Sequence, residues 1–200
     1  MKYIFENKLI IFDLDNTLIE ENEYLFSAYQ QIATVFEKYK IPPQEVYNYL
    51  VNKFINSGRK NIFNELCYHF ELAPNIVDEC LNILRTFEPT KRLNLRTSIL
   101  QKFEEYFKNT DYIFIITNGN IRQQKNKVRY TNWGYLKPVV IYAKEYGSKP
   151  NPWSYIQLCQ NYSIQREKVQ VYYCGDSDTD ATFAKNCGIG FINANYAASY

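Results

Sequence analysis

The chain has 200 residues, of which 46% are hydrophobic, and a formal net charge of +2. This length suits one domain, or a core with a smaller insert, and the hydrophobic content argues against a disordered chain. A charge so near zero does not favour binding to nucleic acid or to a membrane surface. The densest basic stretch contains Arg122, Lys125, Lys127 and Arg129. We interpret it as a solvent-exposed helix face rather than a phosphate-binding surface.

Cysteine usage and the chain's N-terminus bear on where the protein works. The five cysteines are odd in number, widely spaced and without a Cys-x-x-Cys pair, which favours reduced and mostly buried thiols. The N-terminus has no apolar segment typical of a secretion signal, and no apolar run approaches membrane-spanning length. We therefore expect a soluble, cytoplasmic protein. The sequence does not indicate an oligomeric state.

The first informative segment is a short apolar run followed by two carboxylates. Leu9–Phe12 is typical of a buried strand of a parallel sheet, and Asp13 and Asp15 follow it. An Asp-x-Asp after a strand is often only a turn. Two carboxylates that converge, however, require a cation or a shared proton, and hard oxygen ligands suit Mg²⁺. Taken alone, the segment leaves both interpretations open.

A helical insert follows this strand directly. The pattern predicts four helices: one carrying the apolar stripe from Leu25 to Tyr39, then helices over Gln44–Ile55, Asn61–Phe70 and Pro74–Phe87. Pro74 is expected in the first turn of the last helix. Residues 19–92 are therefore predicted to form a helical cap, with residues 1–18 and 93–200 forming an α/β core.

Strands and helices alternate through the rest of the chain. Further strands are predicted at Ile113–Ile116, Val139–Ala143, Val169–Cys174 and Gly190–Asn193. A helical stripe joins Leu95, Ile99, Phe103 and Tyr106, and another begins at Trp153. This alternation predicts a doubly wound, Rossmann-like parallel sheet with helices on both faces.

Two of these strands run into polar segments. Ile116 is followed by Thr117-Asn118-Gly119, whose hydroxyl, amide and backbone donors can bind an oxyanion, although Asn-Gly is also a common turn pair. Lys149 lies between Ser148 and Pro150, and Pro150 restricts the backbone of the residue before it. A lysine held there can neutralise a phosphate, although a solvent-exposed loop lysine is the alternative.

The last core strand leads into an acidic segment. Asp176, Asp178 and Asp180 lie within five residues directly after Cys174-Gly175. Three carboxylates after a buried strand require a cation or hydrogen-bond donors. Asp176 and Asp180 are predicted to contact a metal and an adjoining lysine, and Asp178 to face solvent or cap the next helix. That helix is predicted to end at Gly188.

In chain order the segments are Asp13-x-Asp15, Thr117-Asn118-Gly119, Lys149-Pro150 and Gly175-Asp176-x-x-x-Asp180. This ordered set resembles the four motifs of the haloacid dehalogenase superfamily. The helical insert lies where that superfamily carries its type-one cap. Within the superfamily the chain resembles the phosphatase branch, and more loosely the phosphoglycolate and N-acylneuraminate phosphatase-like proteins.

The resemblance implies a Mg²⁺-dependent phosphatase that hydrolyses a small phosphate monoester, such as a sugar phosphate. It makes Asp13 the nucleophile that forms an aspartyl-phosphate and Asp15 the general acid and base. Mg²⁺ would be held by the Asp13 carboxylate, the Asp15 carbonyl and Asp176. The remaining site residues would be Thr117 and Asn118, which bind phosphoryl oxygens, and Lys149, which adds positive charge and is positioned by Asp180.

Other functions remain to be weighed. A haloacid dehalogenase needs neither an acid for an alcohol leaving group nor Mg²⁺, so Asp15 argues against it. A phosphoglucomutase shares the core motifs and would pass phosphate to a sugar. The helical insert does not fit a signalling receiver domain. A non-catalytic binding protein would gain nothing from so many crowded carboxylates.

Residues of the insert give little evidence of the substrate. Arg59 and Lys60 can reach an anionic group but are expected to face solvent. His69, the only histidine, is expected to lie on a helix surface or to be partly buried, without a catalytic role. Tyr24 and Phe26 are expected either to contact a substrate or to anchor the insert.

Overall fold

The computed structural model describes residues 6–165 and 167–196. The chain forms two compact units, one of Met1–Glu21 with Arg92–Tyr200 and one of Asn22–Lys91. We call them the α/β unit and the helical unit. The insert predicted from the sequence ran from residue 19 to residue 92, within three residues of these divisions.

The α/β unit is built on a five-stranded parallel sheet in the order β5-β3-β1-β6-β7. The strands are β1 (Lys8–Phe12), β3 (Tyr112–Thr117), β5 (Lys137–Tyr142), β6 (Gln170–Gly175) and β7 (Gly190–Asn193). Each predicted core strand is present, and the predicted α/β fold class is confirmed. Because β1 lies between β3 and β6, the strand order changes direction beside its carboxyl end, where ligands bind in sheets of this kind.

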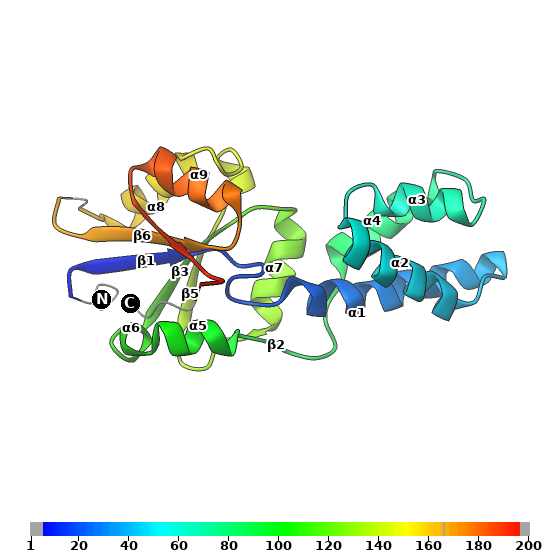
Figure 1. The fold of residues 1–200 in the computed structure, drawn as a ribbon, viewed down its shortest axis with the longest axis horizontal. Helices are drawn as coiled ribbons and strands as arrows, with labels where there is room; N and C mark the ends of the chain where they lie inside the picture. Colours follow the sequence, from blue (N-terminus) through cyan, green and yellow to red (C-terminus); the bar gives the residue numbers. More distant parts are fainter. Residues whose placement is uncertain (1–5, 166, 197–200) are drawn as a thin grey trace. The chain divides into compact units, whose positions relative to one another are not determined.

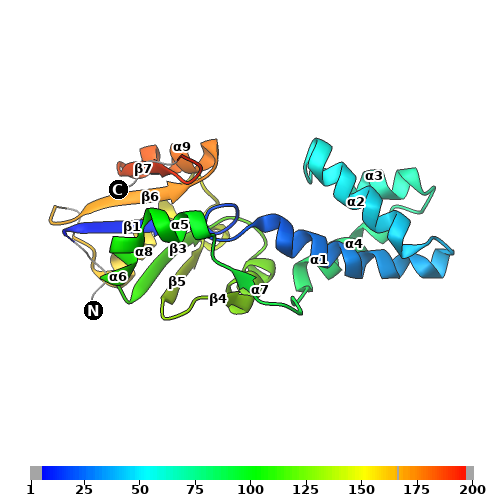
Figure 2. The ribbon, with the colours of Figure 1, turned by 60° about the horizontal axis from the view of Figure 1, so that its bottom comes forward.

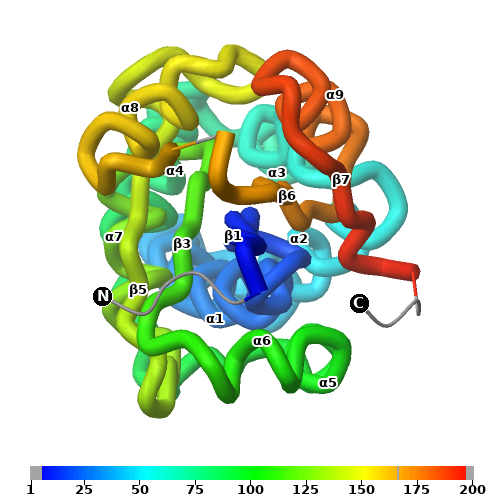
Figure 3. The backbone as a smooth tube through the Cα atoms, turned by 90° about the vertical axis from the view of Figure 1, so that its left-hand side faces the viewer, coloured from blue at the N-terminus to red at the C-terminus, as the bar shows by residue number. Residues whose placement is uncertain are grey.

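Alternate residues of the strands face opposite sides of the sheet. Leu9 and Ile11 contribute to a core with α8 (Trp153–Tyr162) and α9 (Asp178–Cys187). Phe12, on the opposite face, packs edge-on against Phe103 and stacks on Phe107. Figures 1 and 3 show α8 and α9 over one face and α5 (Thr97–Lys102) and α6 (Glu104–Lys108) over the other. The sheet is therefore covered on both sides, which is why β1 and β3 are apolar and buried over most of their length.

Two local predictions for the α/β unit are corrected. The stripe from Leu95 to Tyr106 forms two helices, α5 and α6, because the chain leaves helical geometry at Phe103. The turn lets the rings of Phe103 and Phe107 both reach Phe12, and Figure 2 brings these helices to the front. A small second sheet, β2 (Leu93–Asn94) with β4 (Thr131–Asn132), was not predicted, since two-residue strands carry no periodic signal.

The helical unit holds most of α1 (Glu21–Thr34), followed by η1 (Val35–Tyr39), α2 (Pro43–Ser57), α3 (Ile62–His69) and α4 (Ile76–Thr86). The predicted helix through Tyr39 is wrong at its end, because a 3₁₀ turn replaces the α-helix after Thr34. Pro74 lies before α4 rather than in its first turn, and its carbonyl accepts from the Val77 N–H.

Side chains of the helical unit behave mostly as structural residues. Tyr24 is buried, and its hydroxyl donates to the Phe87 carbonyl at 2.9 Å. The Phe26 ring packs edge-on against Phe54. Arg59 and Lys60 are exposed, and His69 is an exposed helix residue whose ring stacks on Tyr49. The anchoring interpretation of Tyr24 and Phe26 therefore accounts for their contacts within this unit.

Among the described residues, no helix is long and apolar enough to cross a membrane. All five cysteines have free thiols, and four of them are buried.

Candidate active site

The predicted site residues lie where three neighbouring strands end. Asp13 follows β1, Thr117 closes β3, and Asp176 follows β6. Asp13 continues the β1 ladder, because its N–H donates to the Cys174 carbonyl at 2.8 Å. The strand therefore fixes the direction of the Asp13 side chain, which has the same parity as Leu9 and Ile11. Parallel strands bring residues more than a hundred positions apart in sequence to one edge.

Lys149 joins two of the carboxylates at this edge. Its ammonium donates to Asp13 Oδ1 at 2.7 Å, to Asp180 Oδ1 at 2.6 Å and to the Tyr173 hydroxyl at 2.7 Å. A lysine ammonium has three N–H donors, so these contacts use all of them. The Tyr173 hydroxyl in turn donates to the Ile116 carbonyl at 2.7 Å. Lys149 is thus held within the site and is not the exposed loop residue of the alternative interpretation.

The buried charges influence one another strongly. Burial raises the pKa of Asp13 to about 7, although the charge of Lys149 acts in the opposite direction. Burial acts to lower the pKa of Lys149, but the charges of Asp13 and Asp180 outweigh it and the pKa is raised. Burial, and then the charge of Asp180, raises the pKa of Asp176. The crowded carboxylates therefore favour a further cation at this edge.

The Asn118 side chain positions the Lys149 backbone. Its Oδ1 accepts from the Lys149 N–H at 2.8 Å, and its Nδ2 donates to the Lys149 carbonyl at 3.1 Å. The side-chain amide of Asn118 is therefore committed to the lysine loop, and phosphate binding by the amides near Asn118 stays a prediction. Thr117 is buried, and its hydroxyl makes a contact of 3.2 Å with the Asn118 carbonyl.

Asp180 is held by the first turn of α9. Ser177 is the N-cap residue: its Oγ accepts from the Asp180 N–H at 3.3 Å and its N–H donates to Asp180 Oδ2 at 3.2 Å, which completes a capping box. The Ser177 Oγ also donates to Asp180 Oδ2 at 2.6 Å. A Cβ at Gly175 would lie 2.5 Å from the Asp180 Cβ, so glycine is needed there for the approach. Asp178 is exposed and does not cap the helix.

Three carboxylates can hold a metal ion at this edge. Oxygen atoms of Asp13, Asp176 and Asp180 all lie within 4.8 Å of one another. Carboxylate oxygens suit Mg²⁺, which binds few protein ligands and keeps several waters. The group includes two of the predicted ligands, Asp13 and Asp176, and adds Asp180. The donor set therefore fits a hard divalent cation.

The Asp15 carboxylate lies outside that group and contacts α7 (Ile121–Tyr130) instead. Its Oδ1 accepts from Lys127 Nζ at 2.6 Å, and its Oδ2 accepts from Gln124 Nε2 at 2.8 Å. Lys127 Nζ also lies 3.4 Å from Glu21 Oε1. The two aspartates of the Asp-Leu-Asp segment are thus paired with two different lysines.

This contact corrects the interpretation of the basic stretch. Lys127 was expected on a solvent-exposed helix face, but its side chain is 0% exposed. The buried residues of α7 are polar: Gln123, Gln124, Asn126 and Lys127. Apolar periodicity is the signal that marks the buried face of a helix, so a polar buried face gives none. The available sign of this buried face was that Gln124 and Lys127 are three residues apart, a spacing that places both side chains on one side of a helix.

The segment between β1 and α1 is fixed by its own contacts. Asn16 adopts a positive φ of 55°, and its Oδ1 accepts from the Glu21 N–H at 3.1 Å. The Arg96 guanidinium donates to the Asn16 carbonyl and pairs with Glu20, with 2.8 Å between Arg96 Nε and Glu20 Oε1. These contacts tie the loop that carries Asp15 to the start of α1 and to Arg96.

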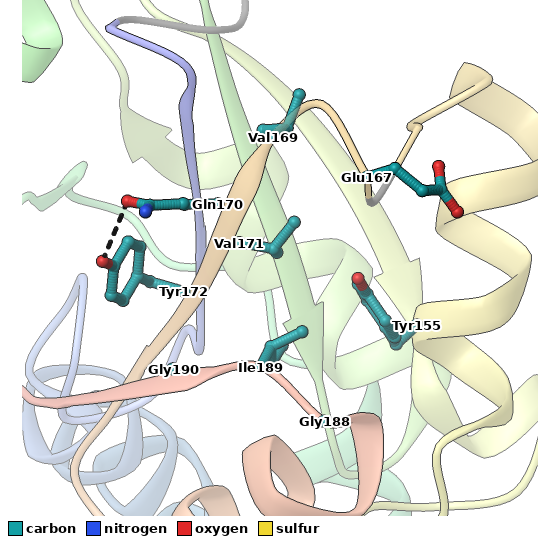
Figure 4. Close-up of a pocket in the computed structure, with 9 residues that line it drawn as sticks. All are labelled: Tyr155, Glu167, Val169, Gln170, Val171, Tyr172, Gly188, Ile189 and Gly190. Atoms are coloured by element: carbon teal, nitrogen blue, oxygen red, sulfur yellow. Dashed lines mark hydrogen bonds between the residues drawn. The ribbon is translucent and has the colours of Figure 1, made fainter.

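A separate depression of about 500 Å³ lies at the amino-terminal ends of β6 and β7 (Figure 4). The only charged side chain among the described residues that line it is Glu167. Figure 4 shows this carboxylate together with the Tyr155 hydroxyl and the amide of Gln170. The described residues that line this depression therefore offer no cationic side chain to an anion.

A family model described as haloacid dehalogenase-like hydrolase matches residues 10–194. This range includes Asp13 and Asp180 and nearly the whole chain. A search of curated proteins finds no match.

Several solved structures resemble the chain. A haloacid dehalogenase-superfamily hydrolase of Geobacter sulfurreducens superposes with a TM-score of 0.62 at 17% identity, covering 93% of this chain and 86% of that one. YfnB of Bacillus subtilis, in a magnesium-bound structure, gives 0.61 at 17% identity, with 92% and 85% covered. A HAD phosphatase of Thermococcus onnurineus gives 0.55 at 18% identity, with 96% and 89% covered. At these identities the likeness concerns the fold.

Proposed function

Because the chain belongs to the haloacid dehalogenase-like hydrolase family, we propose that it is a Mg²⁺-dependent phosphatase of a small phosphate monoester. The observation that carries the proposal is the convergence of Asp13, Asp176 and Asp180 around Lys149 at the carboxyl ends of β1 and β6. A nucleophilic carboxylate, a metal-binding carboxylate set and a buried cation are the parts that phosphoryl transfer from a monoester requires.

Asp13 is the nucleophile of the proposed reaction. Its carboxylate oxygen attacks phosphorus as the bond to the leaving oxygen breaks, which leaves an aspartyl-phosphate and an alcohol. Burial places this carboxylate in a site of low dielectric, where Lys149 at 2.7 Å fixes its orientation. Because every N–H of Lys149 already has an acceptor, the lysine adds charge and position, and it contacts phosphate only by releasing one of them.

Asp15 is the proposed acid and base. It gives its proton to the leaving oxygen in the first step and takes one from the attacking water in the second. Its side chain is 16% exposed, so a substrate or water can reach it. Thr117 and backbone amides beside it are the proposed phosphoryl contacts, and Asn118 acts through the Lys149 backbone.

Asp13 and Asp176, with Asp180 close by, are the proposed holders of Mg²⁺. The ion offsets the repulsion between an anionic nucleophile and an anionic phosphate. We further propose that the helical unit is a cap that selects the substrate, and that the enzyme works in the cytoplasm on a soluble metabolite.

The test is phosphate release from a panel of phosphorylated sugars, nucleotides and small acids. Turnover should require Mg²⁺, stop in excess chelator and return when Mg²⁺ is restored. Acid quenching during turnover should trap phosphate on Asp13, located by peptide mass spectrometry. Transfer of the label to a sugar rather than to water would replace the phosphatase by a mutase. Phosphate release that persists without bound metal would contradict the proposal.

A further inference from the structure

The buried face of α7 carries one charged side chain, that of Lys127, whose burial calls for an explanation. An ammonium removed from water costs several kcal/mol unless it is paired and hydrogen-bonded. Lys127 is 0% exposed, and its described carboxylate partners, Asp15 and Glu21, both belong to the segment that links β1 to α1. The lysine therefore connects a helix behind the site to the loop that carries Asp15.

Both oxygens of the Asp15 carboxylate receive a donor from α7. Lys127 Nζ lies 2.6 Å from Oδ1, and Gln124 Nε2 lies 2.8 Å from Oδ2. The same Gln124 Nε2 donates to the Asn118 carbonyl at 2.9 Å, so the loop after β3 fixes the amide as well. A Cβ on Gly119 would lie 2.8 Å from that nitrogen, and its absence leaves room for the glutamine. Two donors on two oxygens fix the plane of the carboxylate.

The arrangement leaves Asp15 able to transfer a proton. An ionised carboxylate offers about four lone-pair sites, and α7 occupies two of them. The carboxylate also lies outside the group formed by Asp13, Asp176 and Asp180. When one of the two remaining sites carries a proton, that proton can pass to a leaving oxygen as the bond to phosphorus breaks, and the ionised carboxylate can then take a proton from the water that attacks the aspartyl-phosphate.

We propose that Lys127 and Gln124 are positioning residues that set the orientation of the Asp15 carboxylate for proton transfer. The inference rests on the proposed function, because Asp15 is the acid and base of that reaction. Neither residue is expected to contact phosphate. Their loss should therefore lower kcat and leave KM nearly unchanged, in contrast to the loss of a substrate contact.

The experiment compares two esters that differ in their need for an acid. Lys127→Met keeps the length of the side chain and removes its charge. We expect kcat for an alkyl phosphate to fall by about tenfold to a hundredfold, part of the 10²–10⁴ that acid–base catalysis supplies. The first turnover of p-nitrophenyl phosphate, whose leaving group needs no proton, should fall much less. Lys127→Arg should restore part of the alkyl phosphate activity.

Lys125→Met is the matched control, because Lys125 is an exposed lysine of the same helix. It should leave both esters unaffected. In an Asp15→Asn background, Lys127→Met should cause no further loss, since the two changes act through one group. If Lys127→Met does not fold, Gln124→Leu removes the other donor and should show the same dependence on the leaving group.

Equal losses on both esters, a rise in KM, or additive losses with Asp15→Asn would overturn the inference while leaving the phosphatase intact. A wild-type protein that releases phosphate from neither ester would instead refute the proposed function. A crystal structure of Lys127→Met tests separately whether Lys127 positions Asp15. The Asp15 carboxylate should turn away from its place against α7, and an unmoved carboxylate would refute the positioning role.

Discussion

Each of the two aspartates in the segment Asp13-Leu14-Asp15 pairs with a buried lysine, and the surroundings of the two lysines differ. Lys149 lies on a loop and donates to Asp13, Asp180 and Tyr173. Lys127 lies on a helix and pairs with Asp15 and Glu21. The first lysine lies within a group of carboxylates that can hold a metal; the second lies outside it.

The difference distinguishes a lysine that compensates the charge of carboxylates from a lysine that orients one carboxylate. Lys149 offsets the repulsion between Asp13 and Asp180, so its removal leaves buried carboxylates without a cation. Lys127, together with Gln124, holds one carboxylate in place through both of its oxygens. A buried lysine beside an aspartate can thus play either part.

The largest effect is expected from Asp13→Asn. An amide is not a nucleophile, so phosphate release should fall by more than about a thousandfold. Asparagine keeps the shape of the side chain, and the circular dichroism spectrum should match the wild type. Ordinary turnover by this variant would refute the assignment of Asp13 as the nucleophile. The group of side chains around Lys149 would then lose its importance for the reaction.

Asp15→Asn should cause the next largest loss. We expect kcat for an alkyl phosphate to fall by about 10²–10⁴, the range for general acid–base catalysis. Steady-state kinetics with a series of esters should show a loss that shrinks as the leaving group improves. A loss independent of the leaving group would mean that Asp15 acts on binding rather than on proton transfer.

Lys149→Met should destabilise the protein. Breaking a buried ion pair by removing one partner costs about 3–5 kcal/mol, measured here as the free energy of unfolding in urea with chelator present. Mg²⁺ should restore more stability to this variant than to the wild type, because the ion then supplies the missing positive charge. An equal response of the two proteins to Mg²⁺ would argue that the metal and Lys149 act on different carboxylates.

The last effect is a pH dependence of the stability of the metal-free protein. The pKa of Asp13 is raised from 3.8 to about 7, so the folded protein binds more protons than the unfolded chain between those values. Stability from this group is present at low pH and is lost as pH rises from about 4 to 7. Urea unfolding should show a steeper decline in that window for the wild type than for Asp13→Asn. Parallel curves would mean that Asp13 is already ionised below it.

The sequence predicted the parts of the molecule that repeat a simple pattern. Apolar runs such as Ile113–Ile116 identified the strands, and carboxylates following them identified Asp13 and Asp176, because a parallel sheet brings such positions to one edge. Lys149 was identified because Lys149-Pro150 occupies the third place in the ordered set of four motifs. Tyr173 was missed, since its alternation within β6 marks only a core residue.

Other features depended on contacts that no local pattern reports. Lys127 and Gln124 occupy a helix whose buried face is polar, so apolar periodicity could not mark either residue as buried, and Lys127 was assigned to solvent with the rest of the basic stretch. The break at Phe103 follows from two rings reaching Phe12 across the fold. In both cases tertiary contacts overrode the local tendency of the chain.

The central position of β1 has a consequence for how the protein reaches its folded state. β1 pairs with β3, which lies about a hundred residues later in the chain, and with β6, which lies about 160 residues later. Pairings so distant in sequence form slowly, because much chain entropy is lost before they are made. The edge that holds Asp13, Lys149 and Asp180 therefore cannot exist in a growing chain until β6 and the start of α9 have been synthesised. Although β1 precedes β3 and β6 in the chain, it completes its contacts only when β6 is present.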